Sequence, residues 1–220
     1  MKTKLAGAFM KSEYGNPFEM ANEKHSNKRK LAIFDLDGTL FDTKEVNYLA
    51  YKEAVEKYGY HIDYGYFKDF CYGRHYMEFL PGITTDDSNV LRIMHDIKQS
   101  AYSKYVGRAQ ANIWLFDLIE TIKVGYYIAL VTTASKRNTY EILQAFDKED
   151  VFDIILTHED ISKSKPDPEG FLKAMGYFGI CRENTIIFED SDIGAEAAER
   201  SGAGVMMVRG FHSFNGKIIE

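Results

Sequence analysis

The length and composition of this 220-residue chain are typical of a folded globular protein, since 45% of its residues are hydrophobic and only 4 are proline. Lys and Arg number 27 against 33 Asp and Glu, so no overall positive field would attract nucleic acid or an anionic membrane. Cys71 and Cys181 form no C-x-x-C motif, which predicts neither a disulfide framework nor a zinc cluster. No apolar run approaches the roughly 20 residues that span a bilayer. We therefore expect a soluble, cytoplasmic protein.

Short apolar runs predict the strands of a parallel α/β sheet. Residues 1–30 lack sustained periodicity, so we expect an N-terminal extension there with no catalytic role. The apolar runs that follow lie at residues 31–34, 126–131, 153–156, 185–188 and 204–208. Segments of helical character separate these runs, most clearly at residues 138–146 and 193–201, and such alternation is typical of a parallel sheet flanked by helices.

The interval between the first two predicted strands is long enough to hold a structure of its own. It spans about ninety residues (35–125), whereas a minimal crossover needs only about 10 to 12. Two apolar stripes at helical spacing fall within it, one made of Val46, Leu49, Ala50, Ala54 and Tyr58 and the other of Val90, Met94, Ile97, Ala101 and Tyr105. We therefore predict a helical cap at residues 45–110, inserted into an α/β catalytic core formed by residues 31–44 and 111–220.

Two carboxylates, Asp35 and Asp37, directly follow the first predicted strand. They would leave the sheet at the carboxyl end of that strand, where open α/β sheets bind their ligands. One carboxylate can attack phosphorus, while its neighbour protonates the departing oxygen and later deprotonates water. Gly38 then permits a sharp turn. The alternative interpretation is an acidic turn that caps the next helix.

Hydroxyl and ammonium groups follow later strands. Thr132 and Thr133 come directly after the second strand, near the predicted start of a helix, where they could cradle a phosphate or simply cap that helix. Lys165 lies between prolines that fix the backbone around it, so its ammonium could point into a site. Most such lysines are merely solvated, and Lys163 is a competing candidate.

Glu189 and Asp190 follow the fourth predicted strand. Their carboxylates are hard oxygen ligands suited to Mg²⁺, which usually keeps several waters beside one or two carboxylates. Helix capping by Ser191 or Asp192 is again the simpler alternative. Four such motifs, in this order and each beyond a predicted strand or its loop, are improbable as independent capping accidents.

The four motifs together resemble those of the haloacid dehalogenase superfamily. They are Asp35-Leu36-Asp37-Gly38-Thr39, Val131-Thr132, Lys165-Pro166 and Glu189-Asp190-Ser191 with Gly194. The resemblance covers about residues 31–210 and implies a Rossmann-like sheet with a helical cap inserted after the first strand. It is closest to the branch of phosphoglycolate phosphatases and β-phosphoglucomutase-like proteins.

The resemblance also implies a role for each acidic residue. Asp35 would be the nucleophile that becomes an aspartyl phosphate, and Asp37 would be the general acid and base. Mg²⁺ would be held by the Asp35 carboxylate, the Asp37 backbone carbonyl and Asp190, with Glu189 as a direct ligand or acting through water. The substrate would be a small phosphorylated metabolite.

The same resemblance assigns Thr132 and Lys165 to the phosphoryl oxygens, with Thr133 as the alternative hydroxyl. Asp37 argues against dehalogenation, because the true dehalogenases lack an aspartate at that position. Sugar phosphomutases of the β-phosphoglucomutase type carry a histidine twelve residues after the nucleophile, where this chain has Asn47. A phosphatase is therefore the favoured interpretation, with a phosphomutase and a non-catalytic phosphate-binding protein as alternatives.

The predicted cap is rich in tyrosine. Its tyrosines include Tyr48, Tyr51, Tyr64, Tyr66, Tyr72 and Tyr76. These rings could stack on a ring-bearing substrate, but tyrosines in such numbers more often fill a core. The sequence alone does not assign any of them to the site.

Overall fold

Five parallel strands form the main sheet of the computed structural model, which describes residues 28–211. In the order in which they pair, the strands are β5 (Ile154–Leu156), β4 (Tyr126–Val131), β1 (Lys30–Phe34), β6 (Thr185–Glu189) and β7 (Gly204–Met207). Each strand lies within one residue of its predicted apolar run, so the parallel α/β sheet is confirmed. Most of the predicted N-terminal extension, residues 1–27, lies outside the described residues.

Both faces of this sheet are covered by helices, which explains why its strands are apolar runs and not alternating sequences. Side chains of β1 alternate between the faces: Leu31 and Ile33 pack in one core cluster, and Ala32 and Phe34 pack in the other. The helices α5 (Ile113–Ile122) and α6 (Lys136–Ala145) supply buried residues to the cluster of Phe34. The helices α7 (Glu169–Phe178) and α8 (Asp192–Ser201) supply those of the opposite face.

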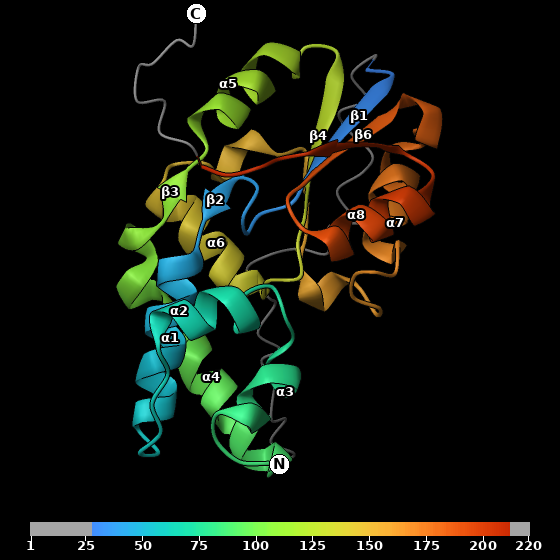
Figure 1. Cartoon of the computed structure of the whole chain (residues 1–220). Coiled ribbons are helices and arrows are strands. Elements are labelled where there is room, and N and C mark those ends of the chain that lie inside the picture. Colours follow the sequence, from blue (N-terminus) through green and yellow to red (C-terminus); the bar gives the residue numbers. More distant parts are fainter. Residues whose placement is uncertain (1–27, 212–220) are drawn as a thin grey trace, which may run out of the picture.

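A separate helical layer is inserted between β1 and β4, below the sheet in Figure 1. It contains α1 (Lys44–Glu56), α2 (Tyr64–Tyr66), a π-helical turn (Phe67–Cys71), α3 (Tyr76–Phe79) and α4 (Ser88–Tyr105). These elements bury a core of their own, rich in aromatic side chains. The cap predicted after the first strand is thus present, and its bounds at residues 45 and 110 stay a prediction.

Two short strands mark where the chain enters and leaves the cap. β2 (Phe41–Asp42) pairs antiparallel with β3 (Gln110–Ala111). Short 3₁₀ turns complete the chain at Leu80–Gly82, Val106–Arg108, Glu149–Val151, His158–Asp160 and Arg182–Asn184. Over the described residues, none of the helices combines the length and the apolar character that a membrane crossing requires.

The buried face of α4 differs from the predicted stripe. Its buried side chains are Leu91, Met94, Lys98, Ala101 and Tyr102. Only two of them, Met94 and Ala101, belong to the predicted set. The reason is that α4 contacts α1, α3 and α6, so its buried surface is set by several neighbours and not by one. On α1 the predicted Val46, Ala50 and Ala54 are buried.

Lys98 is the unexpected member of this buried face, with a relative exposure of only 7%. Its Nζ lies 5.1 Å from the ring centroid of Tyr51 and 5.3 Å from that of Tyr102, close enough for cation–π attraction. No carboxylate within residues 28–211 forms an ion pair with it. Burial lowers the pKa of Lys98 to about 8, although the charge of Asp37 acts in the opposite direction.

We predict that Lys98→Met raises the free energy of unfolding at about pH 7 by roughly 1 to 3 kcal/mol, because it removes a buried charge that has no counter-ion. The pKa of Lys98 is lowered in the folded state, so the unfolded chain binds more protons between about pH 8 and pH 10.5. Stability of the unmodified chain therefore rises with pH across that window. The gain in free energy of unfolding that Lys98→Met gives over the unmodified chain should therefore become smaller as the pH rises through this window.

Urea denaturation at about pH 7 and about pH 9.5 measures both effects. Lys104→Met is the control, because it makes the same change at an exposed position of the same helix. It should not gain free energy of unfolding at about pH 7 and lose that gain at about pH 9.5. A Lys98→Met protein less stable than the unmodified chain at neutral pH would show that the ammonium contributes favourably where it lies.

Candidate active site

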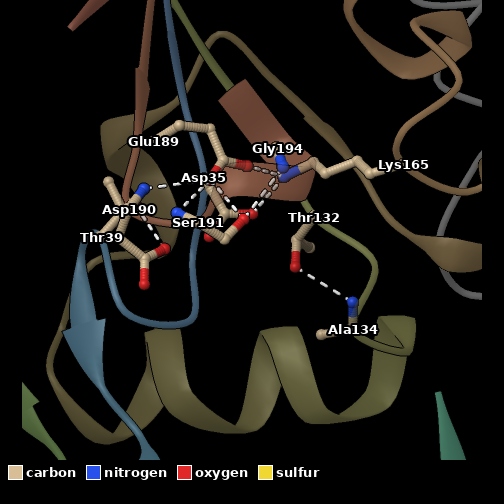
Figure 2. Close-up of polar contacts among 9 residues, drawn as sticks. All are labelled: Asp35, Thr39, Thr132, Ala134, Lys165, Glu189, Asp190, Ser191 and Gly194. Carbon is tan, nitrogen blue, oxygen red and sulfur yellow. Dashed lines mark hydrogen bonds and ion pairs between the residues drawn. The ribbon is translucent and has the colours of Figure 1, made fainter. Parts of the chain in front are cut away.

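The pairing of β1 with β6 brings three carboxylates together at the carboxyl ends of these two strands. Asp35 follows β1 directly, and its backbone N–H donates to the Phe188 carbonyl of β6 at 3.0 Å. Glu189 ends β6 and Asp190 follows it. Carboxylate oxygens of Asp35, Glu189 and Asp190 all lie within 4.8 Å of one another (Figure 2).

Lys165 enters this cluster from the loop that precedes α7. Its Nζ lies 2.5 Å from Asp35 Oδ1 and also donates to Glu189 Oε1. Burial alone would lower the pKa of Lys165, but the two carboxylates outweigh burial and raise it, so the ammonium stays charged. Lys163, the competing candidate, instead pairs with Asp167 at 3.8 Å and is exposed.

Glu189 is the most firmly held of the three acids, with a relative exposure of 1%. One oxygen accepts from Lys165. The other, Oε2, accepts from the Asp190 N–H at 3.0 Å, the Ser191 N–H at 3.2 Å and the Ser191 hydroxyl at 3.1 Å. This carboxylate therefore orients Lys165 and also belongs to the cluster of three acids. Ser191 also caps α8 by accepting from Gly194 N–H at 3.0 Å, so the capping interpretation holds beside the functional one.

Asp190 lies on the open side of the cluster. Its Oδ1 accepts from the Thr39 hydroxyl at 3.2 Å (Figure 2). Burial, together with the neighbouring charge of Glu189, raises the pKa of Asp190 to about 6. Gly38 passes so close that a Cβ there would lie 2.0 Å from Asp190 Oδ2, and its φ of 92° also favours glycine. Glycine is thus required at this position of the D-x-D-G turn, both by its φ and by the closeness of Asp190.

The charges and donor atoms of this cluster fit a divalent cation. Three carboxylates share one ammonium, and burial combined with the charges of Glu189 and Asp190 raises the pKa of Asp35 well above its ordinary value. Burial is the larger cause and the neighbouring carboxylates the smaller one, and a bound cation would favour the ionised form of Asp35 against both. The donors are all carboxylate oxygens, the ligand type that Mg²⁺ prefers.

The two threonines after β4 differ in their surroundings. Thr132 is buried, with a relative exposure of 1%, and its Oγ1 accepts from the Ala134 N–H at 3.0 Å. This bond leaves the proton of the Thr132 hydroxyl available for another acceptor. Thr133 is exposed. The N-cap of α6 is Ser135, so neither threonine is needed to cap that helix.

Asp37 lies in a hydrogen-bonded group that the sequence did not reveal. Its Oδ1 accepts from the Thr43 hydroxyl and, at 3.5 Å, from the Asn47 side-chain amide. The Thr43 hydroxyl also lies 3.0 Å from the hydroxyl of Tyr72. The sequence contained one partial signal for this group, because Thr43 and Asn47 are four residues apart at the start of α1 and such a spacing places two side chains on one face of a helix. Nothing in the sequence connects Tyr72 to them.

Comparisons with known proteins assign the family. A model of haloacid dehalogenase-like hydrolases matches residues 32–208. The phosphorylated carbohydrates phosphatase of Thermotoga maritima is 30% identical over 83% of this chain and 86% of its own length. The β-phosphoglucomutase of Bacillus subtilis is 26% identical over 79% of this chain and 80% of its own. The chain therefore belongs to the haloacid dehalogenase-like hydrolases, an enzyme family.

Solved structures agree with this assignment. CbbY from Rhodobacter sphaeroides in complex with phosphate superposes with a TM-score of 0.73 at 23% identity, covering 86% of this chain and 92% of that one. A putative β-phosphoglucomutase from Thermotoga maritima gives a TM-score of 0.63 at 28% identity, covering 84% and 88%. The relatives thus come from the phosphatase and β-phosphoglucomutase branch that the sequence motifs indicated.

We predict that Gly194→Ala destabilises the fold by roughly 1 to 3 kcal/mol through overpacking. A Cβ at this position would lie 2.0 Å from the carboxyl carbon of Glu189, whose carboxylate is held in place by hydrogen bonds from Lys165, Asp190 and Ser191. The loss should appear although alanine is the better helix former. Urea denaturation measures the change.

Gly176→Ala is the matched control, because Gly176 is an exposed glycine of α7 where an added Cβ would meet no atom within 4 Å. Its free energy of unfolding should rise by about 0.5 to 1 kcal/mol. Equal stabilisation by both alanines would show that Glu189 can move aside without cost.

Proposed function

We propose that this chain is a Mg²⁺-dependent phosphatase that hydrolyses a small phosphate monoester through an aspartyl-phosphate intermediate. One observation carries the proposal. A buried carboxylate, Asp35, is held 2.5 Å from the charged Lys165 beside two further carboxylates, at the ligand-binding end of a parallel sheet. A nucleophile, a cation for phosphoryl oxygens and oxygen ligands for a metal are the parts that phosphoryl transfer needs.

In the first step, an Asp35 oxygen attacks phosphorus in line while the bond between phosphorus and the leaving oxygen breaks. Asp37 donates its proton to that leaving oxygen, which departs as an alcohol. In the second step, Asp37 takes a proton from water as the water oxygen attacks the phosphorus of the aspartyl phosphate. Inorganic phosphate leaves and the Asp35 carboxylate is regenerated.

The remaining groups bind and orient the phosphoryl group. Lys165 and the free proton of Thr132 would donate to its oxygens, and Glu189 would keep the ammonium aimed at them. Asp35, Asp190 and the Asp37 carbonyl would hold Mg²⁺, with Glu189 as a direct ligand or acting through water. Bound Mg²⁺ would offset the repulsion between the Asp35 carboxylate and the anionic phosphate.

The names of the relatives support a phosphorylated sugar or a similar small metabolite as the substrate. One is a phosphorylated carbohydrates phosphatase, and a CbbY structure contains xylulose-(1,5)bisphosphate. A cytoplasmic location would agree with such a substrate. A phosphomutase is the second candidate because a β-phosphoglucomutase is among the relatives, but Asn47 stands where that type carries a histidine.

We expect the purified chain to release phosphate from p-nitrophenyl phosphate and from members of a sugar-phosphate panel only when Mg²⁺ is present. Asp35→Asn removes the nucleophile and should lower kcat by at least about 10³-fold. Phosphate release measured with and without a chelator tests both statements. Asp117→Asn, the same change at an exposed position of α5, should leave turnover intact.

Product analysis on the same panel separates the candidates. An isomerised sugar phosphate that forms only with a bisphosphate activator would assign a phosphomutase. The absence of both release and isomerisation would leave the non-catalytic phosphate-binding protein.

A further inference from the structure

The Thr43 hydroxyl links Asp37 to the cap. It is fully buried and meets three polar groups: the Asp37 carboxylate, the Tyr72 hydroxyl at 3.0 Å and the Asn47 side-chain amide at 3.1 Å. Thr43 and Asn47 lie at the start of α1, whereas Tyr72 follows the π-helical turn 29 residues further along the chain. One buried oxygen therefore joins the candidate general acid to a distant cap segment.

The chemistry of these groups determines the direction of each hydrogen bond. A hydroxyl has one proton and two lone pairs, and an amide N–H can only donate. The Asn47 amide has two protons for three acceptors, namely the Thr43 carbonyl and hydroxyl at 3.1 Å and Asp37 Oδ1 at 3.5 Å, so its bond to Oδ1 is shared, and in that bond Oδ1 is the acceptor. The Thr43 proton is therefore given to Asp37, and Tyr72 must donate to Thr43. With Asn47 on the second lone pair, the Thr43 hydroxyl is saturated.

The two oxygens of Asp37 are consequently not equivalent. Oδ1 accepts two hydrogen bonds, whereas Oδ2 has no hydrogen-bond partner among residues 28–211. We propose that Tyr72, Thr43 and Asn47 are positioning residues that hold Asp37 by Oδ1 and leave Oδ2 to exchange the proton with the leaving group and with water. This inference rests on the proposed phosphatase activity and assigns the proton-transferring atom within it.

Tyr72 makes this arrangement depend on where the cap lies. Its ring packs 6.3 Å from that of Phe67 in the cap, and the Lys44 ammonium lies 5.1 Å from its centroid. Burial and the charge of Asp37 raise the pKa of the Tyr72 phenol, so it keeps the proton that it donates. Movement of this cap segment away from α1 would break the Tyr72 contact and leave the Thr43 lone pair without its donor.

The dependence on leaving group distinguishes this role from general support of the fold. A general acid matters most when the departing oxygen is strongly basic, as in a sugar or alkyl ester. The p-nitrophenolate group departs with little need of a proton. Hydrolysis of the aspartyl phosphate, in which Asp37 acts as base, is common to all esters and can limit kcat, whereas kcat/KM reports only the steps up to departure of the leaving group. Misplacing Asp37 should therefore lower kcat/KM for sugar or alkyl phosphates far more than for p-nitrophenyl phosphate, whereas general damage to the site should lower both alike.

Tyr72→Phe and Thr43→Val remove the two hydroxyls while keeping nearly the same shape. On a sugar or alkyl phosphate we expect kcat/KM to fall by about 10-fold for Tyr72→Phe and by about 10²-fold for Thr43→Val. On p-nitrophenyl phosphate the kcat/KM of both variants should stay within about twofold, while kcat can fall on either ester through the shared second step. The Thr43 side chain makes no capping hydrogen bond to α1, so Thr43→Val does not uncap that helix.

Two further variants serve as controls. Thr43→Ser keeps the hydroxyl and should retain most of the turnover on both esters. Tyr66→Phe removes a hydroxyl from an exposed tyrosine of the cap and should match the unmodified enzyme. Equal losses of kcat/KM on both esters, no loss on either, or a higher kcat/KM in Tyr72→Phe or Thr43→Val would each overturn the proposal.

Unfolding measurements test the hydrogen bond without any turnover. If Tyr72 donates to Thr43, the destabilisation of the double variant should be smaller than the sum of the two single ones. Strict additivity would refute the contact. Failure of the proposed function would look different, because the unmodified chain would then release no phosphate from any ester with Mg²⁺ present.

Discussion

The ion pair of Lys165 with Asp35 and Glu189 is the interaction on which the rest of the site depends. Parallel pairing of β1 and β6 places three carboxylates side by side, and without a cation between them their repulsion would oppose the fold itself. Lys165 supplies that cation from a separate loop. The groups proposed for catalysis are thus also the groups that balance charge at the end of the sheet.

Much of this architecture could be predicted because the relevant constraints are local in the sequence. A strand buried on both faces must be apolar throughout, so each apolar run predicted the bounds of its strand to within one residue. The carboxyl ends of parallel strands lie on one edge of the sheet, so residues just after them, such as Asp35 and Asp190, can meet there, and the resemblance assigned both to one metal site. Lys165 was assigned to the site by the family resemblance, because it lies in a longer loop and does not directly follow a strand.

The rest could not be predicted because it depends on contacts between distant segments. Nothing in the sequence separates the buried Lys98 from a solvated lysine, since the Tyr51 ring that lies beside its ammonium belongs to α1, which only the folded chain brings against α4. Tyr72 was one of many cap tyrosines, and only the folded chain brings its hydroxyl to Thr43. Most cap aromatics do fill a core, as their number indicated.

The short ribbon of β2 and β3 gives the cap a particular kind of attachment. Because the two connecting strands are hydrogen-bonded to each other, the chain enters and leaves the cap as one paired ribbon and not as two independent linkers. The returning strand is followed by Asn112, which donates to the carbonyl of Thr39 at 3.2 Å, and the Thr39 hydroxyl donates to Asp190. A displacement of the cap at this ribbon would therefore reach Asp190, one of the carboxylates proposed to hold the metal, through the hydrogen bonds of Asn112 and Thr39.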